Sequence, residues 1–148
     1  MNSKLSNTDA RQEPWSSSGP GEQPFLGAHL ITKRHGYSHH GIYVGAGRVV
    51  HYAGLSGGLW HCGPVEEVSL SRFGGGSAIG TVEYTTVTYS PEEIVRRARS
   101  RLGENDYRLL TNNCEHFCNW CVSGVSRSAQ VQRPLQLPLR ALAALFHT

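Results

Sequence analysis

The stretch that decides the fold lies in the last third of the chain and runs Asn113-Cys114-Glu115-His116-Phe117-Cys118. Asparagine is a preferred helix N-cap and Gly124 is a typical stop, so the stretch predicts a helix that starts at Asn112-Asn113. Cys114 then falls in the first turn, where unpaired backbone amides and the helix dipole stabilise an anion. A thiol reacts as its thiolate, so this position makes Cys114 the candidate nucleophile.

A cysteine nucleophile needs a base, and three histidines of the preceding segment are candidates: His39, His40 and His51. Histidine has an ordinary pKa near neutrality, so it can take the thiol proton and return it to a leaving group. Residues 41–44 and 48–52 predict two strands joined by a tight turn. Since neighbouring strand positions point to opposite faces, only one of His39 and His40 can share the face of His51.

The turn between these strands decides which histidine it is. A two-residue turn at Ala46-Gly47 brings His40 to the face of His51. A three-residue turn with Gly47 in the left-handed bulge position brings His39 there instead. Gly47 suits the bulge, but composition alone leaves both registers open.

The chain divides into three parts by composition. Residues 1–24 are rich in Ser, Asn, Gly, Gln and Pro, which predicts a disordered leader. Residues 25–128 carry the predicted strands and helices and form the expected catalytic domain. Residues 129–148 form an apolar tail that is too short to span a bilayer and is interrupted by Pro138 and Arg140. We expect this tail to dock on the protein's own apolar surface or to contact a membrane surface weakly.

Between the leader and the tail, the sequence predicts further elements of both kinds. Strands are expected at residues 26–32 and, from alternating side chains, at residues 79–89. The glycine-rich segment 54–76 predicts irregular structure. Four of its apolar side chains should hold it to the core: Val65, Val68, Leu70 and Phe73.

The clearest helix start is Ser90-Pro91-Glu92-Glu93, because serine caps a helix, proline suits its first turn and Glu93 completes a capping box. The helix should end at Gly103. Its apolar stripe consists of Ile94, Val95, Ala98 and Leu102. Its arginines should face mainly solvent: Arg96, Arg97, Arg99 and Arg101.

Composition excludes several classes of protein. With 148 residues the chain holds one domain with one core. The net charge is +3 and no basic block is longer than Arg96-Arg97, which argues against a nucleic-acid surface. No signal-like segment and no apolar run of about 20 residues occurs, so we expect a cytoplasmic protein with reduced thiols.

Three motifs occur in a fixed order along the chain: Tyr37-Ser38-His39-His40-Gly41-Ile42-Tyr43-Val44-Gly45, then Val49-Val50-His51, then Asn113-Cys114-Glu115-His116-Phe117. Together they resemble the lecithin:retinol acyltransferase-like family from about Pro24 to Val125. The resemblance implies an α+β fold, a circularly permuted relative of papain-like thiol hydrolases. In that fold an antiparallel sheet packs on helices and the nucleophile lies at a helix N-terminus.

The resemblance also implies roles for individual residues. Cys114 matches the nucleophile, His39 the base and His51 a second histidine that orients the base. The implied activity is a thiol-dependent acyltransferase or phospholipase that acts on lipid acyl esters through a Cys114 thioester, without a cofactor. Tyr37, His40 and Asn113 are candidates for contacting the substrate or its oxyanion.

Two other functions remain open at this stage. The same attack on an amide carbonyl would make the protein a cysteine amidase or peptidase. The same fold without catalysis would make it a binding or inhibitor protein with a protein partner. A zinc site is disfavoured because its potential ligands lack the usual knuckle spacing: His61, Cys62, Cys114, Cys118 and Cys121.

Overall fold

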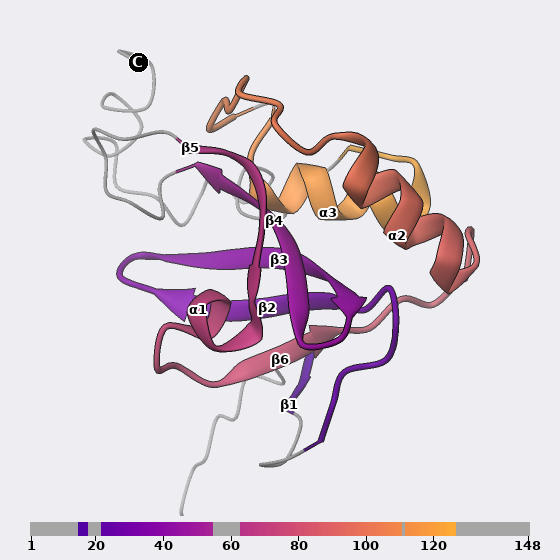
Figure 1. Cartoon of the computed structure of the whole chain (residues 1–148), viewed down its shortest axis with the longest axis horizontal. Coiled ribbons are helices and arrows are strands. Elements are labelled where there is room, and N and C mark those ends of the chain that lie inside the picture. The colour runs from indigo at the N-terminus through magenta and orange to yellow at the C-terminus, as the bar shows by residue number, and fades with distance from the viewer. Residues whose placement is uncertain (1–14, 18–21, 55–62, 111, 127–148) are drawn as a thin grey trace, which may run out of the picture.

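The computed structural model describes residues 15–17, 22–54, 63–110 and 112–126 (Figure 1). Its centre is an antiparallel sheet of six strands in the order β1-β6-β2-β3-β4-β5. The strands are β1 (Trp15–Ser17), β2 (His29–Arg34), β3 (Tyr37–Gly45), β4 (Arg48–Gly54), β5 (Gly63–Ser69) and β6 (Ile79–Val82). The helices are α1 (Leu70–Gly74), α2 (Pro91–Ser100) and α3 (Cys114–Ser123). The expected α+β class with an antiparallel sheet is therefore confirmed.

The two faces of the sheet carry separate cores because side chains alternate along each strand. Helices α2 and α3 lie together over one face (Figure 1) and bury Ile42, Val50, Tyr52 and Val65 against Ile94, Ala98, Phe117 and Cys118. The short helix α1 closes the other face, where the buried side chains are Ala28, Leu30, Tyr43, Val49, Val68 and Phe73. The expected core residues Val65, Val68 and Phe73 are all buried.

The β3–β4 turn is a two-residue turn preceded by a bulge. Gly45 pairs with Arg48, and the two residues between them, Ala46 and Gly47, have φ angles of 51° and 71°. Two successive positive φ values are typical of a type I′ hairpin turn. The turn thus has the length of one predicted alternative.

The register of the strands is nevertheless that of the other alternative. A shift between Tyr43 and Gly45 moves the pairing by one residue, so that Gly41 lies opposite His51. His39 therefore shares the face of His51, and His40 points to the opposite face. The bulge, which the sequence did not predict at this place, decides the orientation of both histidines.

The glycine at the centre of β3 is required by close packing. A Cβ atom on Gly41 would lie 2.6 Å from Val49 Cγ1 and 2.8 Å from Phe73 Cε2. Neither neighbour is a flexible chain end, so a side chain could not be accommodated without moving the core. Because of this close approach, Phe73 of α1 packs directly beside His39 and His51.

Several predicted boundaries were wrong. The segment predicted to be irregular contains β5 and α1, because Ser69 caps α1 and β5 pairs with β4 along Arg48–Gly54. The strand predicted at 79–89 ends at Val82, and the strand predicted at 26–32 covers His29–Arg34. Within the predicted leader, Trp15–Ser17 forms a strand that pairs with β6. The apolar tail at 129–148 lies outside the described residues.

Helix α2 begins and packs largely as predicted. Ser90 Oγ accepts a hydrogen bond from Glu93 N at 3.2 Å, and Ile94, Val95 and Ala98 are buried. Leu102, in contrast, is 44% exposed and lies beyond the helix.

Two of the arginines predicted to face solvent instead pack on α3. The guanidinium of Arg97 lies 3.9 Å from the centre of the Trp120 ring, and that of Arg101 lies 5.0 Å from the centre of the Phe117 ring. Among the described residues, no helix is long and apolar enough to cross a membrane.

Candidate active site

Cys114 is the first residue of α3, as the sequence predicted, and the helix ends at Gly124 in the left-handed conformation. Asn113 caps the helix: its Oδ1 accepts hydrogen bonds from Glu115 N and His116 N, both at 3.0 Å. His116 completes the capping box because its Nδ1 accepts a hydrogen bond from Asn113 N at 3.2 Å. The cap fixes the backbone on both sides of the thiol.

The thiol of Cys114 lies beside the first residues of β3. β3 pairs with β2 from Tyr37 onward, whereas the pairing of β3 with β4 starts only at Gly41. Cys114 Sγ is 4.0 Å from Ser38 O, at the part of β3 that precedes the pairing with β4. Helix α3 thus brings its N-terminus to the residues on either side of His39.

Burial dominates the acidity of the thiol. Cys114 is 3% exposed, and this burial raises the pKa of its thiol to about 11. The backbone N–H of His40 lowers the pKa, the Glu115 carboxylate raises it, and the N–H groups of Glu115 and Cys114 lower it. Desolvation therefore raises the thiol pKa by more than the helix N-terminus lowers it, and the expected thiolate does not form.

His39, His51 and Glu66 form a hydrogen-bonded row on the α1 face of the sheet. His39 Nε2 lies 2.6 Å from His51 Nδ1, and His51 Nε2 lies 3.0 Å from Glu66 Oε1. The pairing of β4 with β5 places Glu66 directly opposite His51. The ring of Phe73 holds both imidazoles, with ring centres 5.3 Å from His39 and 6.0 Å from His51.

The order of donors in this row follows from Glu66. An ionised carboxylate only accepts hydrogen bonds, so His51 Nε2 carries the proton of that ring and its Nδ1 accepts. His39 Nε2 must then donate to His51, which leaves Nδ1 of a neutral His39 with a free lone pair. Burial, together with repulsion from His51 and Arg34, lowers the pKa of His39 well below its usual value. His39 is therefore neutral at pH 7 and able to accept a proton.

The structure brings some of the candidate residues together and leaves others apart. Among the described residues, no hydrogen bond joins Cys114 Sγ to the imidazole of His39; the sulfur lies at the backbone of the neighbouring residues. Tyr37 lies near both: its ring centre is 6.5 Å from that of His39, and its pKa is raised mainly by burial and further by the neighbouring Cys114. The side chain of Asn113 is engaged in the helix cap, with Nδ2 donating to Leu109 O at 2.9 Å.

His40 belongs to a second polar network on the other face of the sheet. His40 Nδ1 lies 2.7 Å from His29 Nε2, and His29 Nδ1 lies 2.6 Å from the hydroxyl of Tyr84. That hydroxyl donates to Asn119 Oδ1 at 2.6 Å. The remaining ring nitrogen of His40 is 3.7 Å from Glu115 Oε2 and has no hydrogen-bond partner among the residues that the structure describes. Burial lowers the pKa of His40 to about 4 and that of His29 well below its usual value.

Sequence reasoning missed Glu66, His29 and Tyr84. Glu66 lies in β5, where Val65 and Val68 are three residues apart and do not show the two-residue period of a strand. Had the sequence predicted a strand at residues 63–69 that pairs antiparallel with β4, this pairing would have placed Glu66 beside His51. His29 and Tyr84 each look like an isolated polar residue, and only the fold brings them together.

A metal site finds no support in the described part of the chain, where no group of three or more His, Cys, Asp or Glu side chains is arranged to hold a metal ion. Cys114, Cys118 and Cys121 are buried free thiols. Two of the ligands considered for zinc, His61 and Cys62, lie outside the described residues.

Comparison with known proteins identifies relatives of the chain. The family model for lecithin retinol acyltransferase matches residues 22–127. Human phospholipase A and acyltransferase 2 is 36% identical over 124 residues, which cover 74% of this chain and 76% of the relative. Human phospholipase A and acyltransferase 3 is 32% identical over 111 residues, which cover 65% of this chain and 68% of the relative.

More distant relatives are longer than this chain. Lecithin retinol acyltransferase from Mus musculus is 28% identical over 132 residues, covering 70% of this chain and 56% of the relative. The chain thus spans a little more than half of that protein. The match of the family model to most of the chain, including both histidine strands and the cysteine helix, shows that the chain belongs to the lecithin retinol acyltransferase family.

Proposed function

We propose that the protein is a thiol-dependent acyltransferase or phospholipase that acts on lipid acyl esters through a thioester on Cys114. The observation that carries the proposal is the row from Glu66 through His51 to His39. This row leaves His39 with one nitrogen free to accept a proton. His39 lies between Ser38 and His40, and the backbone of both residues approaches the Cys114 sulfur. The names of the relatives support lipid acyl esters as the substrate class.

In the proposed first step, His39 Nδ1 takes the proton of the Cys114 thiol while the sulfur attacks the carbonyl carbon of the ester. A carbon–sulfur bond forms, the bond to the alkoxy oxygen breaks, and the proton on His39 passes to that leaving oxygen. A raised thiol pKa and a neutral histidine suit this concerted transfer. The pair would then react without a stable thiolate–imidazolium ion pair in the resting enzyme.

In the second step, an acceptor attacks the thioester carbonyl after giving its proton to His39, and the thiol is released with that proton. Water as acceptor gives a phospholipase, and an amine or a hydroxyl group gives an acyltransferase. The backbone N–H groups of His40 and Glu115 approach the sulfur and are candidates for stabilising the oxyanion. Tyr37 is a candidate for contacting the substrate because it lies near both Cys114 and His39.

The order of the catalytic elements supports a circularly permuted papain-like arrangement. The strands with His39 and His51 precede the helix that starts at Cys114, so the base comes before the nucleophile in the chain. Cys114 then acts as the nucleophile and His39 as the base, while His51 and Glu66 orient His39.

The experiment is a search for the thioester by intact mass spectrometry after incubation with a short-chain phosphatidylcholine. The mass should rise by one acyl group, and neutral hydroxylamine should remove that group. Cys114→Ser should give no hydroxylamine-labile adduct, because an oxyester resists this treatment. Cys118→Ala removes a buried thiol from the same helix and should still react. An adduct located on Cys118 would refute Cys114 as the nucleophile.

The choice of substrates separates the remaining functions. If phospholipids, simple thioesters and activated esters give neither adduct nor product with folded protein, acyl transfer is wrong for this chain. Turnover of amides with the same Cys114 dependence would then indicate an amidase or peptidase.

A further inference from the structure

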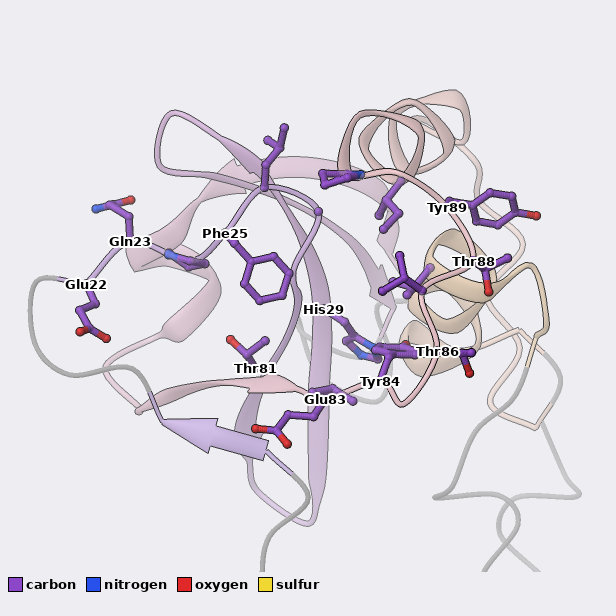
Figure 2. Close-up of a pocket in the computed structure, with 18 residues that line it drawn as sticks. Glu22, Gln23, Phe25, His29, Thr81, Glu83, Tyr84, Thr86, Thr88 and Tyr89 are labelled. Atoms are coloured by element: carbon purple, nitrogen blue, oxygen red, sulfur yellow. The ribbon is translucent and has the colours of Figure 1, made fainter.

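A cavity of about 690 Å³ lies away from Cys114, on the side of the molecule where β2 and β6 meet the ends of α2 and α3. Figure 2 shows the side chains that line it. They come from the segment before β2, from the strands β2 and β6, from the segment between β6 and α2, and from the two helices. The volume falls in the range of about 300–1,000 Å³ typical of small-molecule sites.

The walls of this cavity are mainly apolar. Phe25, Leu26 and Val87 line it and are 65%, 36% and 84% exposed. The ring of Phe25 lies in the middle of the site in Figure 2. Ile94 of α2 and Val122 of α3 form the deeper wall. Exposed apolar side chains that gather around one hollow indicate a binding site for an apolar group.

The polar groups of the cavity restrict the head group of a ligand. His29 and the hydroxyl of Tyr84 lie together in it (Figure 2), and they hydrogen-bond to each other and to the buried network behind them. Burial keeps His29 uncharged, since it lowers the pKa of that imidazole. The charged side chains that line the cavity are therefore Glu22 and Glu83, both acidic. Their carboxylates repel an anion and attract a cation.

We propose that this cavity binds the alkyl chain of a single-chain amphiphile with a zwitterionic or cationic head group, at a site separate from Cys114. The chain would lie against Phe25, Leu26 and Val87, with the positive part of the head near Glu22 and Glu83. Neither Cys114 nor His39 lines the cavity, so the binding does not depend on the proposed acyl transfer.

The experiment is calorimetric titration of the full chain with dodecylphosphocholine below its critical micelle concentration. This compound has no acyl ester, so it cannot be consumed by thioester formation. We expect one molecule bound per chain. Dodecyl phosphate, which has the same chain and an anionic head, should bind roughly fivefold more weakly because two exposed carboxylates contribute only modest energies. Glu83→Gln should reduce that difference.

Variants test the location. Phe25→Asp and Val87→Asp should each weaken binding about tenfold, because each places a charge where the alkyl chain packs. Leu102→Asp changes an equally apolar exposed residue outside the cavity and should bind as the unmodified chain does. Cys114→Ser should also bind normally, so loss of thioester formation and loss of this site are distinguishable. Unchanged binding in both cavity variants, or equal binding of the anionic compound, would overturn the proposal.

Discussion

At Cys114, burial and the helix N-terminus act on the thiol in opposite directions. Surrounding N–H groups favour the thiolate, but desolvation is the larger effect and raises the pKa to about 11. A buried thiol with so high a pKa is protonated at pH 7. In the proposed reaction, its reactivity comes from proton transfer to His39 during the attack.

The first prediction concerns the rate at which iodoacetamide alkylates Cys114. Below the thiol pKa, the thiolate fraction rises tenfold per pH unit, so the rate should keep rising from pH 7 to pH 10 by about tenfold per unit. Mass spectrometry of the peptide that contains Cys114 measures this rate. A plateau already at pH 7 would show a stable thiolate and contradict the raised pKa.

The second prediction concerns Glu66, whose carboxylate accepts the hydrogen bond from His51. Glu66→Gln keeps the size of the side chain but removes the charge that orients the histidine pair. Its carboxylate is 35% exposed, and a partly exposed pair contributes about 1 kcal/mol, so phospholipid turnover should fall about fivefold.

Glu67 provides the matched control for Glu66. Its carboxylate pairs with Arg48 and Arg99, and its side chain points to the opposite face of β5 from that of Glu66. Glu67→Gln should therefore leave turnover unchanged, and an equal loss in both variants would argue that the charge of β5, not the contact with His51, is responsible.

At the scale of elements, the β3–β4 hairpin and the α2–α3 pair position the site. The bulge between Tyr43 and Gly45 turns His39 toward His51, and the late pairing of β4 leaves room for the N-terminus of α3 beside β3. Helix α3 is held in turn by Arg97 of α2, whose guanidinium stacks 4.4 Å from the ring centre of Tyr89 and 3.9 Å from that of Trp120. The placement of the thiol therefore depends on contacts far from it in sequence.

The third prediction tests the contact between α2 and α3. Arg97→Ala removes both ring contacts and the hydrogen bonds to Trp120 O, the shorter of which is 2.8 Å. The free energy of unfolding in urea should fall by about 1–2 kcal/mol. Arg96→Ala is the control, because Arg96 faces solvent and pairs only with Glu93 within the described residues; its loss should leave the free energy of unfolding nearly unchanged.

At the scale of the whole molecule, the sheet separates two histidine networks. The α1 face carries His39 and His51, and the face under α2 and α3 carries His29 and His40. Burial lowers the pKa of each of these four histidines, and also that of His116. The fold therefore keeps them neutral, whereas the unfolded chain protonates them near the ordinary value of 6.5.

The fourth prediction follows from this difference in proton binding. Below pH 6.5 the unfolded chain takes up protons that the folded chain refuses, so the free energy of unfolding should decrease as the pH falls from 7 to 5. Each such histidine contributes a slope of about 1.4 kcal/mol per pH unit between its unfolded and folded pKa values. Urea unfolding at pH 7, 6 and 5 measures the slope.

A variant of His40 tests whether buried histidines cause this slope. The folded pKa of His40, about 4, lies below the tested pH range, so His40 should contribute over the whole range. His40→Gln should reduce the slope by about one histidine's share. His35→Gln removes an exposed histidine between β2 and β3 and serves as the control. A slope that is the same in all three proteins would show that His40 is not held neutral.

The sequence by itself determined the helix ends that are set by capping residues. Asn113 and Gly124 marked the ends of α3, and Ser90 marked the start of α2, because caps satisfy backbone groups within one turn of themselves. The three motifs in order indicated the family. Segments with weak local signals were misjudged: β5 has no two-residue period, and α1 is only five residues long.

Only the tertiary structure decided how the site is assembled. Each local choice of turn left the orientation of His39 and His40 open, and a bulge two residues before the turn resolved it. Glu66 joined the site through strand pairing, and His29 met Tyr84 across 55 residues of sequence. The pKa of Cys114 likewise depended on what buries it, whereas the sequence showed only its place on a helix. Pairing register, packing and desolvation are properties of groups distant along the chain, so no local pattern specifies them.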